Sequence, residues 1–467
     1  MSPAADFGVM PRRLSRRDRL VVGLVAAAAV AVRLPDVWSQ SLWEDEVASA
    51  RIIAQPTLLQ MLARVVRTES TPPLWYLGEW LLHRAGMPMV DGRLVSVFLG
   101  GLLLVLVIGL ARWFLSFPLA LAAGLLVGLG GEFVRHGSEL RAYELLAVLT
   151  VLLARCLIAQ MTEPRRKHAA ALAATVAAGG LTHFFFAFSV LAALSWLLVD
   201  PTVRARRRQT VLPMVAGGLV AMSWIPLMLV QYHPTRLAWI GSFHLRPVLA
   251  VPLRLFSYAE TRPLVGPVLS LLALLLVLTG GIRLGRRSSA GRLLLVLALA
   301  PLAEAALVWR LGMPIFDLRN LIGVGAFCAI TGLAALDALP RRAAVTAAST
   351  LCVLTALSLA SSGLRWIPPY QQMARTLIQR GWNGTQAIAI FGDPYAYRSP
   401  LEWYLPGRPT LTIHRPGTRR CGVIYILHAT DRVSRQTWDH ADRASGLQGA
   451  VFLVAGRADP PRRTGCA

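Results

Sequence analysis

Long apolar runs, separated by short polar stretches, recur along nearly the whole chain. About eleven of them approach or exceed the roughly 18–20 residues that a helix needs to cross a bilayer. The pattern predicts a polytopic all-α membrane protein. Its membrane helices are expected at about 20–36, 94–115, 118–132, 143–161, two in a hairpin over 169–200, 211–230, one before the arginines at 283, 292–309, one before the arginines at 341, and 343–362.

Composition and charge agree with a membrane protein. Of the 467 residues, 55% are hydrophobic and 15% are charged, with a formal net charge of +24. This charge does not indicate a nucleic-acid partner, because the arginines fall in short blocks between the apolar runs, as in cytoplasmic loops. Lys167 is the only lysine, which is typical of a GC-rich bacterial genome. We therefore expect a multi-pass protein of a bacterial plasma membrane, with arginine blocks at 12–19, 163–168, 204–208, 283–292 and 341–342 on the cytoplasmic side.

The alternation of these blocks predicts the topology. The basic N-terminus, 1–19, is expected in the cytoplasm, and 20–362 form the membrane domain. The stretch "SRRDRLVVG" is similar to a twin-arginine signal, but the many later apolar runs favour a retained first helix. Two sizeable loops, about 37–92 and 231–263, then lie on the extracytoplasmic side, together with the region 363–467.

One segment of the first outer loop has the spacing of an amphipathic helix. In "PTLLQMLARVVR" the apolar side chains form one stripe, with Gln60, Arg64 and Arg67 opposite. Such a helix lies in the membrane interface or packs beneath the loop. The stripe consists of Leu58, Leu59, Met61, Leu62, Val65 and Val66.

The region 363–467 has a different pattern. "YQQMARTLIQR" predicts an amphipathic helix, and "QAIAIFG", "PTLTIH", "GVIYILHA" and "GAVFLVAGR" predict short strands between Pro and Gly punctuation. We expect a small extracytoplasmic α/β domain. Cys421 and Cys466 lie there, and in an oxidising compartment they form a disulfide or stay as two thiols.

Polar groups gather at the predicted outer ends of the helices. Single charges there often snorkel, but acids and arginines beside lipid collectively mark a functional cavity. Consecutive helical residues point about 100° apart, so three adjacent acids cannot share one pocket. One or two of them face inward while another caps or orients, and we expect Asp45 to face inward. The group comprises Glu44, Asp45, Glu46, Glu69, His136, Glu139, Arg141, Tyr143, His183, Asp317, Arg319 and Asn320.

An acid and several arginines at a membrane surface suit one reaction class. A sugar carried on a lipid phosphate leaves with a phosphate group, whose charge arginines stabilise. A carboxylate then takes the proton of the acceptor hydroxyl. A single displacement of this kind inverts the anomeric centre, and it differs from glycoside hydrolysis by two carboxylates.

The chain also resembles the GT-C membrane glycosyltransferases, particularly the protein O-mannosyltransferase and aminoarabinose-transferase-like branch. Arg33-Leu34 and Leu42–Glu46 resemble the end of that family's first helix and its Leu-Trp-x-Asp-Glu motif. Short segments in the expected order cover most of 30–410. They are "TPPLWYLGEWLLH", "RLVSVFLGGL", "ELRAYELLAVLTVLLA", "THFFFAFSVLA", "LAWIGSFHLRPVL" and "FDLRNLIG".

The resemblance implies transfer of a sugar, a mannose-like hexose or a pentose, from a polyprenyl-phosphate donor to an outer acceptor that is a glycan, lipid or protein. Carried over to matching positions, it makes Asp45 the acceptor base, and Glu46 would orient the acceptor or support the base. Arg141 and Arg319 would bind the donor phosphate, with Tyr143 alongside. Contacts to the sugar or acceptor are expected from Glu44, Glu69, His136, Glu139 and His183.

Three positions depart from the family pattern. Ser70-Thr71 stands where a histidine often precedes the Pro-Pro pair, Asn320 replaces a tyrosine, and Glu44 adds an acid. Some relatives bind a divalent ion near this region, but the acids and His136 have no recognised ligand spacing. Two alternatives to a glycosyltransferase remain: a transporter or flippase for a lipid-linked sugar, and a non-catalytic assembly protein of the cell envelope. A transporter would show inverted repeats and broken helices near the midplane, and the sequence shows no such repeat.

Overall fold

A computed structural model describes most of the chain. The described residues are 14–232, 236–257, 265–362, 367, 370–379, 388–390, 394–407, 413–414, 424–426, 451–454 and 457–458. Cys421, Cys466 and the first two residues of the first arginine block, Arg12 and Arg13, lie outside them. The chain divides into two compact units: Met1–Val37 with Ile52–Leu364, and Trp38–Arg51 with Arg365–Ala467.

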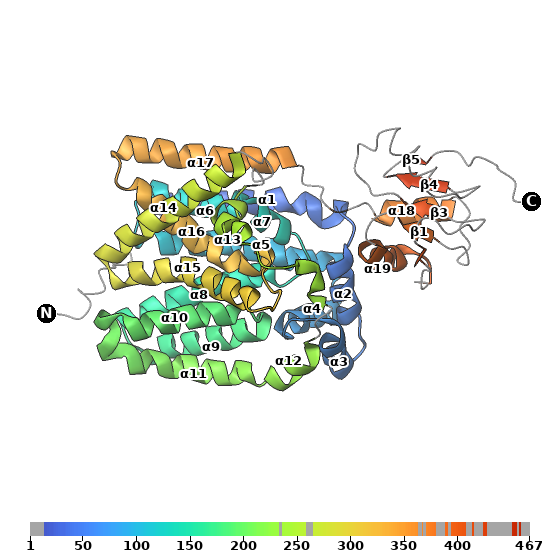
Figure 1. Ribbon diagram of the computed structural model, residues 1–467, viewed down its shortest axis with the longest axis horizontal. Helices are drawn as coiled ribbons and strands as arrows, with labels where there is room; N and C mark the ends of the chain where they lie inside the picture. Colours follow the sequence, from blue (N-terminus) through green and yellow to red (C-terminus); the bar gives the residue numbers. More distant parts are fainter. Residues whose placement is uncertain are drawn as a thin grey trace, which may run out of the picture. The chain divides into compact units, whose positions relative to one another are not determined.

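Every predicted membrane segment contains a helix of the first unit (Figure 1). One prediction differs in detail, because the segment 211–230 breaks at Ser223 and Trp224, where Pro226 opens a second helix. The helices are α1 (Arg16–Ser39), α5 (Arg93–Ala111), α6 (Phe117–Leu129), α8 (Tyr143–Thr162), α9 (Arg166–Thr182), α10 (Phe186–Val199), α11 (Arg207–Met222), α12 (Ile225–Gln231), α14 (Val265–Arg287), α15 (Ser289–Arg310), α16 (Ile322–Leu336) and α17 (Arg341–Ser362).

Seven helices among the described residues are long and apolar enough to cross a membrane. They are α1, α5 with the preceding turn η1 (Met89–Gly92), α8, α14, α15, α16 with η6 (Leu318–Leu321), and α17. An eighth is reached if α10 and α11, bent by 102°, count as one span. The expectation of a multi-pass, mainly helical membrane protein is confirmed. The count of about eleven spans and the orientation of the termini stay predictions.

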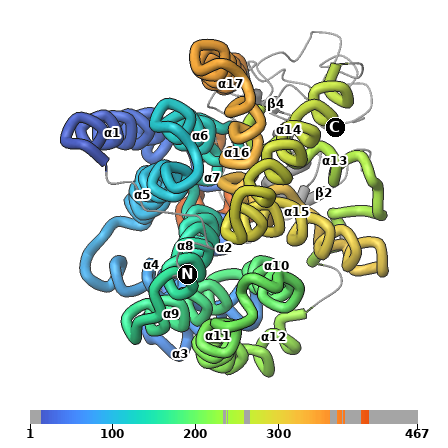
Figure 2. The backbone as a smooth tube through the Cα atoms, turned by 90° about the vertical axis from the view of Figure 1, so that its left-hand side faces the viewer, coloured from blue at the N-terminus to red at the C-terminus, as the bar shows by residue number. Residues whose placement is uncertain are grey.

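Helix α8 lies at the centre of the first unit. It packs against α5, α9 and α16, and Figure 2 shows it between the group formed by α9, α10 and α11 and the group formed by α14, α15 and α16. Small residues let neighbouring helices approach closely in membranes. At Gly323 of α16, an added Cβ would lie only 2.6 Å from the hydroxyl oxygen of Thr150 in α8. This packing fixes α8, whose first residue is Tyr143.

Short helices cover one end of this bundle. α3 (Leu58–Thr68), α4 (Leu74–Arg84), α7 (Gly131–His136) and α13 (Leu245–Arg254) join the long helices. Met61 and Val65 of α3 are buried against Trp75 and Trp224, whereas Leu59 is exposed. The apolar stripe of α3 is therefore mainly a packing face, as one of the two expectations held.

The second unit contains five short strands in one sheet, with the order β2-β1-β3-β4-β5. The first four pair in parallel, and β5 pairs antiparallel to β4. Four of them lie within the four predicted strand segments; placement of this region outside the cytoplasm stays a prediction. The elements are α2 (Glu44–Ile53, up to Arg51 in this unit), α18 (Tyr370–Gln379), α19 (Pro394–Tyr404), β1 (Ile388–Ile390), β2 (Ile413–His414), β3 (Ile424–Ile426), β4 (Val451–Val454) and β5 (Arg457–Ala458).

Candidate active site

Four charged or polar side chains surround the ring of Tyr143 in the first unit. The guanidinium carbons of Arg141 and Arg319 lie 5.9 and 5.8 Å from its centroid. The rings of His136 and His183 lie at 4.8 and 6.0 Å. Tyr143 is buried at the first turn of the central helix α8. The structure therefore brings together residues from three separate segments of the sequence that were expected to act together.

Arg141 is held by an acid and a phenol. Its Nη1 donates to both carboxylate oxygens of Glu69 at 3.3 Å and to the hydroxyl of Tyr76 at 3.2 Å. The Tyr76 hydroxyl also lies 3.2 Å from the hydroxyl of Thr71. Burial raises the pKa of Tyr76, so the phenol stays protonated. These contacts fix the direction of the Arg141 guanidinium.

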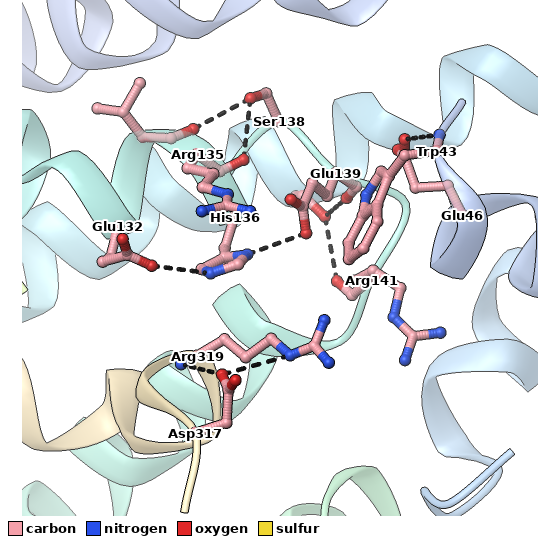
Figure 3. Close-up of polar contacts among 12 residues, drawn as sticks. Trp43, Glu46, Glu132, Arg135, His136, Ser138, Glu139, Arg141, Asp317 and Arg319 are labelled. Atoms are coloured by element: carbon pink, nitrogen blue, oxygen red, sulfur yellow. Dashed lines mark hydrogen bonds and ion pairs between the residues drawn. The ribbon is translucent and has the colours of Figure 1, made fainter. Parts of the chain in front are cut away.

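His136 bridges two carboxylates in the same region (Figure 3). Its Nδ1 lies 2.9 Å from Glu139 and its Nε2 lies 3.1 Å from Glu132. Burial lowers the pKa of His136, but the two carboxylates outweigh this effect and raise the pKa to about 9. The ring is therefore a buried cation at neutral pH. The hydroxyl of Ser96 donates to the backbone oxygen of Glu139 at 2.7 Å and holds the loop that leads to Arg141.

Arg319 is oriented by its neighbour in the chain. Asp317 accepts the backbone N–H of Arg319 at 3.0 Å and thereby caps η6. The same carboxylate lies 3.4 Å from Nε of Arg319 (Figure 3). The guanidinium carbon also lies 5.1 Å from the ring centroid of Trp239. Arg319 is thus placed between two aromatic rings, Tyr143 and Trp239.

His183 differs from His136 in charge. Burial lowers its pKa to about 3, and the positive charges of Arg141 and Arg319 act in the same direction. The backbone N–H of Phe185 donates to Nδ1 at 3.2 Å. Because a neutral ring carries one proton, that proton is on Nε2. His183 therefore offers a neutral N–H donor beside two arginines.

The three predicted acids begin α2 and belong to the second unit. Glu46 accepts the backbone N–H of Trp43 at 3.3 Å, as the third residue of a capping box does. Asp45 uses its backbone oxygen to accept the hydroxyl of Ser49 at 3.1 Å. Glu46 is thus the acid that caps the start of α2. Within the part of the chain that the structure describes, no group of three or more His, Cys, Asp or Glu residues is arranged so that it could hold a metal ion.

Three participants were missed by sequence reasoning. Tyr76 follows the Pro-Pro-Leu segment, Glu132 stands four residues before His136, and Trp239 belongs to the "LAWIGS" segment. The one available signal was the spacing of Glu132 and His136, which places them on one helical face. Tyr76 lies 65 residues before its partner Arg141, and Trp239 lies 80 residues before its partner Arg319. No local sequence pattern predicts contacts over such separations.

Comparisons with known proteins show the fold. No protein-family model matches the sequence, and no curated protein is significantly similar to it. ArnT from Cupriavidus metallidurans, solved bound to undecaprenyl phosphate, is similar with a TM-score of 0.57 and 14% identity, over 84% of this chain and 85% of that one.

Two further solved structures are similar over most of this chain. The archaeal oligosaccharyltransferase AglB from Archaeoglobus fulgidus, in complex with an inhibitory peptide and a dolichol-phosphate, gives a TM-score of 0.56 and 13% identity over 85% of this chain and 64% of that one. The arabinofuranosyltransferase AftD from Mycobacteria gives a TM-score of 0.50 and 18% identity, over 87% of this chain and 32% of that one. The chain therefore has the fold of the GT-C membrane glycosyltransferases, as the resemblance implied.

Proposed function

We propose that the chain is a membrane glycosyltransferase that moves a hexose or pentose from a polyprenyl-phosphate donor to an acceptor hydroxyl on the extracytoplasmic face. The observation that carries the proposal is the placement of Arg141 and Arg319 beside one buried tyrosine ring in a chain with the GT-C fold. Guanidinium groups match phosphate oxygens in geometry and charge. Two neighbours, solved with undecaprenyl phosphate and with a dolichol-phosphate, support the same general ligand.

In the proposed reaction the acceptor oxygen attacks the anomeric carbon of the donor sugar. The bond from that carbon to the phosphate oxygen breaks, and the electron pair leaves with the polyprenyl phosphate. Arg141 and Arg319 stabilise the negative charge that develops on the phosphate. Asp45 takes the proton of the acceptor hydroxyl, and Glu46 supports Asp45 by fixing the first turn of α2. One displacement gives inversion at the anomeric carbon.

The other polar residues have supporting roles in this proposal. Glu69 and the His136–Glu139 pair hold Arg141 and its loop, since their side chains already contact that assembly. His183 is the group best suited to a sugar hydroxyl, because its Nε2 proton has no partner among the described residues. For Glu44 we keep the expected role of a contact to the acceptor.

Transfer from labelled donors tests the proposal. Membranes containing the wild-type chain are incubated with radiolabelled polyprenyl-phosphate sugars, and label is followed into lipid, glycan and protein. We expect transfer by wild type, loss of transfer with Asp45→Asn, and a smaller effect of the adjacent Glu44→Gln. Full transfer by folded Asp45→Asn protein would refute the base assignment, and no transfer from any lipid donor would refute the function. Reporter fusions after residues 170 and 363 should report opposite sides of the membrane.

A further inference from the structure

A hollow of about 660 Å³ opens in the first unit, between the segment 241–243 and the end of α15. Ligand pockets in proteins measure roughly 300–1,000 Å³, so the hollow has room for one or two sugar rings. Ser242 and Phe243 line one side, and Trp309, Arg310 and Pro314 line the other. Nothing in the proposed transfer step uses these residues.

The aromatic wall of the hollow is held in place. Trp309 is buried, and its indole N–H donates to the backbone oxygen of Gly241 at 3.1 Å. Phe243 meets it edge-on, with centroids 5.2 Å apart and an interplanar angle of 67°. Phe316 stacks on it at 5.2 Å and 13°. Such aromatic pairs stabilise one another beyond the area that they bury, so the wall is preorganised.

Arg310 supplies a charge without a partner. It is the last residue of α15 and lines the hollow, and within the described residues its side chain makes no hydrogen bond or ion pair. Arg141 and Arg319 differ in this respect, since each contacts a carboxylate. A guanidinium is always charged at physiological pH and pairs with carboxylates and phosphates through two parallel N–H bonds. Arg310 is therefore available to an anionic ligand.

Both walls of the hollow run directly into the arginine–tyrosine cluster. Trp239, which packs over Arg319, stands two residues before Gly241. Phe316, which stacks on Trp309, stands immediately before Asp317, which orients Arg319. A ligand in the hollow would therefore lie beside the segments that carry the donor-phosphate arginine.

We propose that this hollow binds the acceptor through an anionic sugar residue, a uronic acid or a phosphorylated sugar. The ring would pack against the aromatic wall, and the carboxylate or phosphate would pair with Arg310. A mixed lining of aromatic rings, a hydroxyl and a free guanidinium suits a sugar, whereas a polyprenyl chain would need an apolar one. That the bound ligand is the acceptor rests on the proposed function, whereas binding of an anionic sugar in the hollow does not.

Binding is measured first without any donor. The purified full-length protein in lipid nanodiscs is titrated with glucosyl-glucose and with glucuronosyl-glucose, and saturation-transfer NMR reports the affinity of each. We expect the acidic disaccharide to bind at least about tenfold more tightly, as a charge-assisted bidentate pair would provide. Arg310→Gln should abolish this preference. Arg246→Gln, which removes an exposed arginine of α13 outside the hollow, should retain it.

A blocking variant and a kinetic assay complete the test. Ser242 is exposed, so Ser242→Trp fills the hollow without disturbing the core and should weaken binding of both disaccharides. In the transfer assay, Arg310→Gln should raise the KM of an acidic acceptor about tenfold and leave the donor KM unchanged. Equal binding of the two disaccharides to wild type, a preference that survives Arg310→Gln, or a changed donor KM would overturn the inference. If the protein transferred sugar but did not prefer the acidic disaccharide, the proposed function would hold and this inference would fail. If it preferred the acidic disaccharide but transferred no sugar, the binding site would hold and the proposed function would fail.

Discussion

One guanidinium nitrogen of Arg141 lies 3.3 Å from both carboxylate oxygens of Glu69, across 72 residues of chain. The contact joins the end of α3 to the residue pair that precedes α8. A buried arginine needs such a partner, because an unpaired charge away from water is costly. The same carboxylate leaves the guanidinium close to Tyr143, where a phosphate can approach it. Glu69 thus positions the arginine as well as neutralising it.

The first prediction concerns the shape of the cation. Arg141→Lys and Arg319→Lys keep the charge but remove the planar fork and the stacking on Tyr143. We expect each variant to lower kcat/KM for the donor by about 10- to 100-fold, with little change in acceptor KM. Steady-state transfer with a labelled donor measures this. Arg246→Lys, at an exposed site, is the control. If Arg141→Lys and Arg319→Lys both kept the wild-type kcat/KM for the donor, the proposed binding of the donor phosphate by these arginines would be contradicted.

A second prediction separates the ring of Tyr143 from its hydroxyl. Two guanidinium groups lie within 6 Å of the ring centroid, and each cation–π contact contributes about 0.5–2 kcal/mol. Tyr143→Phe should therefore retain most donor affinity, whereas Tyr143→Leu should lose about tenfold or more. Donor binding to purified protein measures both. Equal losses in the two variants would show that the hydroxyl, not the ring, is required.

Apolar periodicity and the positive blocks between the apolar runs were sufficient to locate the long helices, because both signals are local. They did not find the break at Pro226 inside one predicted helix, since a proline near a helix start and one inside a helix look alike in a single sequence. The gathering of Arg141, Tyr143 and Arg319 was predictable from topology and the family resemblance, because all three were placed at one end of the bundle.

The partners of these residues were not predictable. Tyr76 and Trp239 reach the arginines through packing of distant segments. Two carboxylates keep the buried His136 charged, whereas burial and two arginines keep His183 neutral. Two histidines of the same intrinsic pKa are separated only by their neighbours. Such neighbours are a property of the folded chain, and because of them we propose that His136 supports the loop to Arg141; its expected contact with the sugar stays a prediction.

A third prediction uses this difference as a pH profile. The raised pKa of His136, about 9, stabilises the fold fully below the pKa of an unfolded histidine, roughly 6.5, and this contribution is lost as the pH rises through 9. The depressed pKa of His183, about 3, has the opposite sign: its contribution is present above roughly 6.5 and is lost as the pH falls towards 3. Stability should therefore be greatest near neutral pH.

Thermal unfolding in detergent between pH 6 and 10 tests the alkaline limb. His136→Gln should flatten the decline of the unfolding temperature between pH 7 and 9, whatever its effect on the absolute value. His244→Gln, at an exposed position, should keep the decline. An unchanged slope in His136→Gln would mean that the buried cation does not contribute to the profile.

A fourth prediction concerns Gly137, which ends α7 before the loop to Arg141. An added Cβ would lie 2.5 Å from the backbone oxygen of Phe133, 2.6 Å from Nε of Arg33 and 2.8 Å from a carboxylate oxygen of Glu144, closer than real Cβ atoms come. Its φ of −76° is ordinary, so the contact alone decides the cost. Gly137→Ala should lower the unfolding temperature and slow transfer by displacing the loop. Gly78→Ala, with nothing within 4 Å, should do neither. A Gly137→Ala protein with the unfolding temperature and transfer rate of the wild type would show that the surroundings of Gly137 accommodate a methyl group, which would contradict the prediction.

A fifth prediction concerns the second unit, where α18 and α19 hold the segment that carries Asp45. The buried backbone N–H of Leu42 donates to the hydroxyl of Tyr404 at 2.7 Å, and Arg51 pairs with Glu402 at 3.3 Å. Tyr404→Phe leaves that amide without its partner, at a cost of about 1–3 kcal/mol. We expect kcat to fall severalfold with an unchanged donor KM, because the donor-binding arginines belong to the other unit. Glu402→Gln removes only a partly exposed ion pair, so it should have a smaller effect. A higher donor KM in Tyr404→Phe would instead mean that this segment acts on the donor.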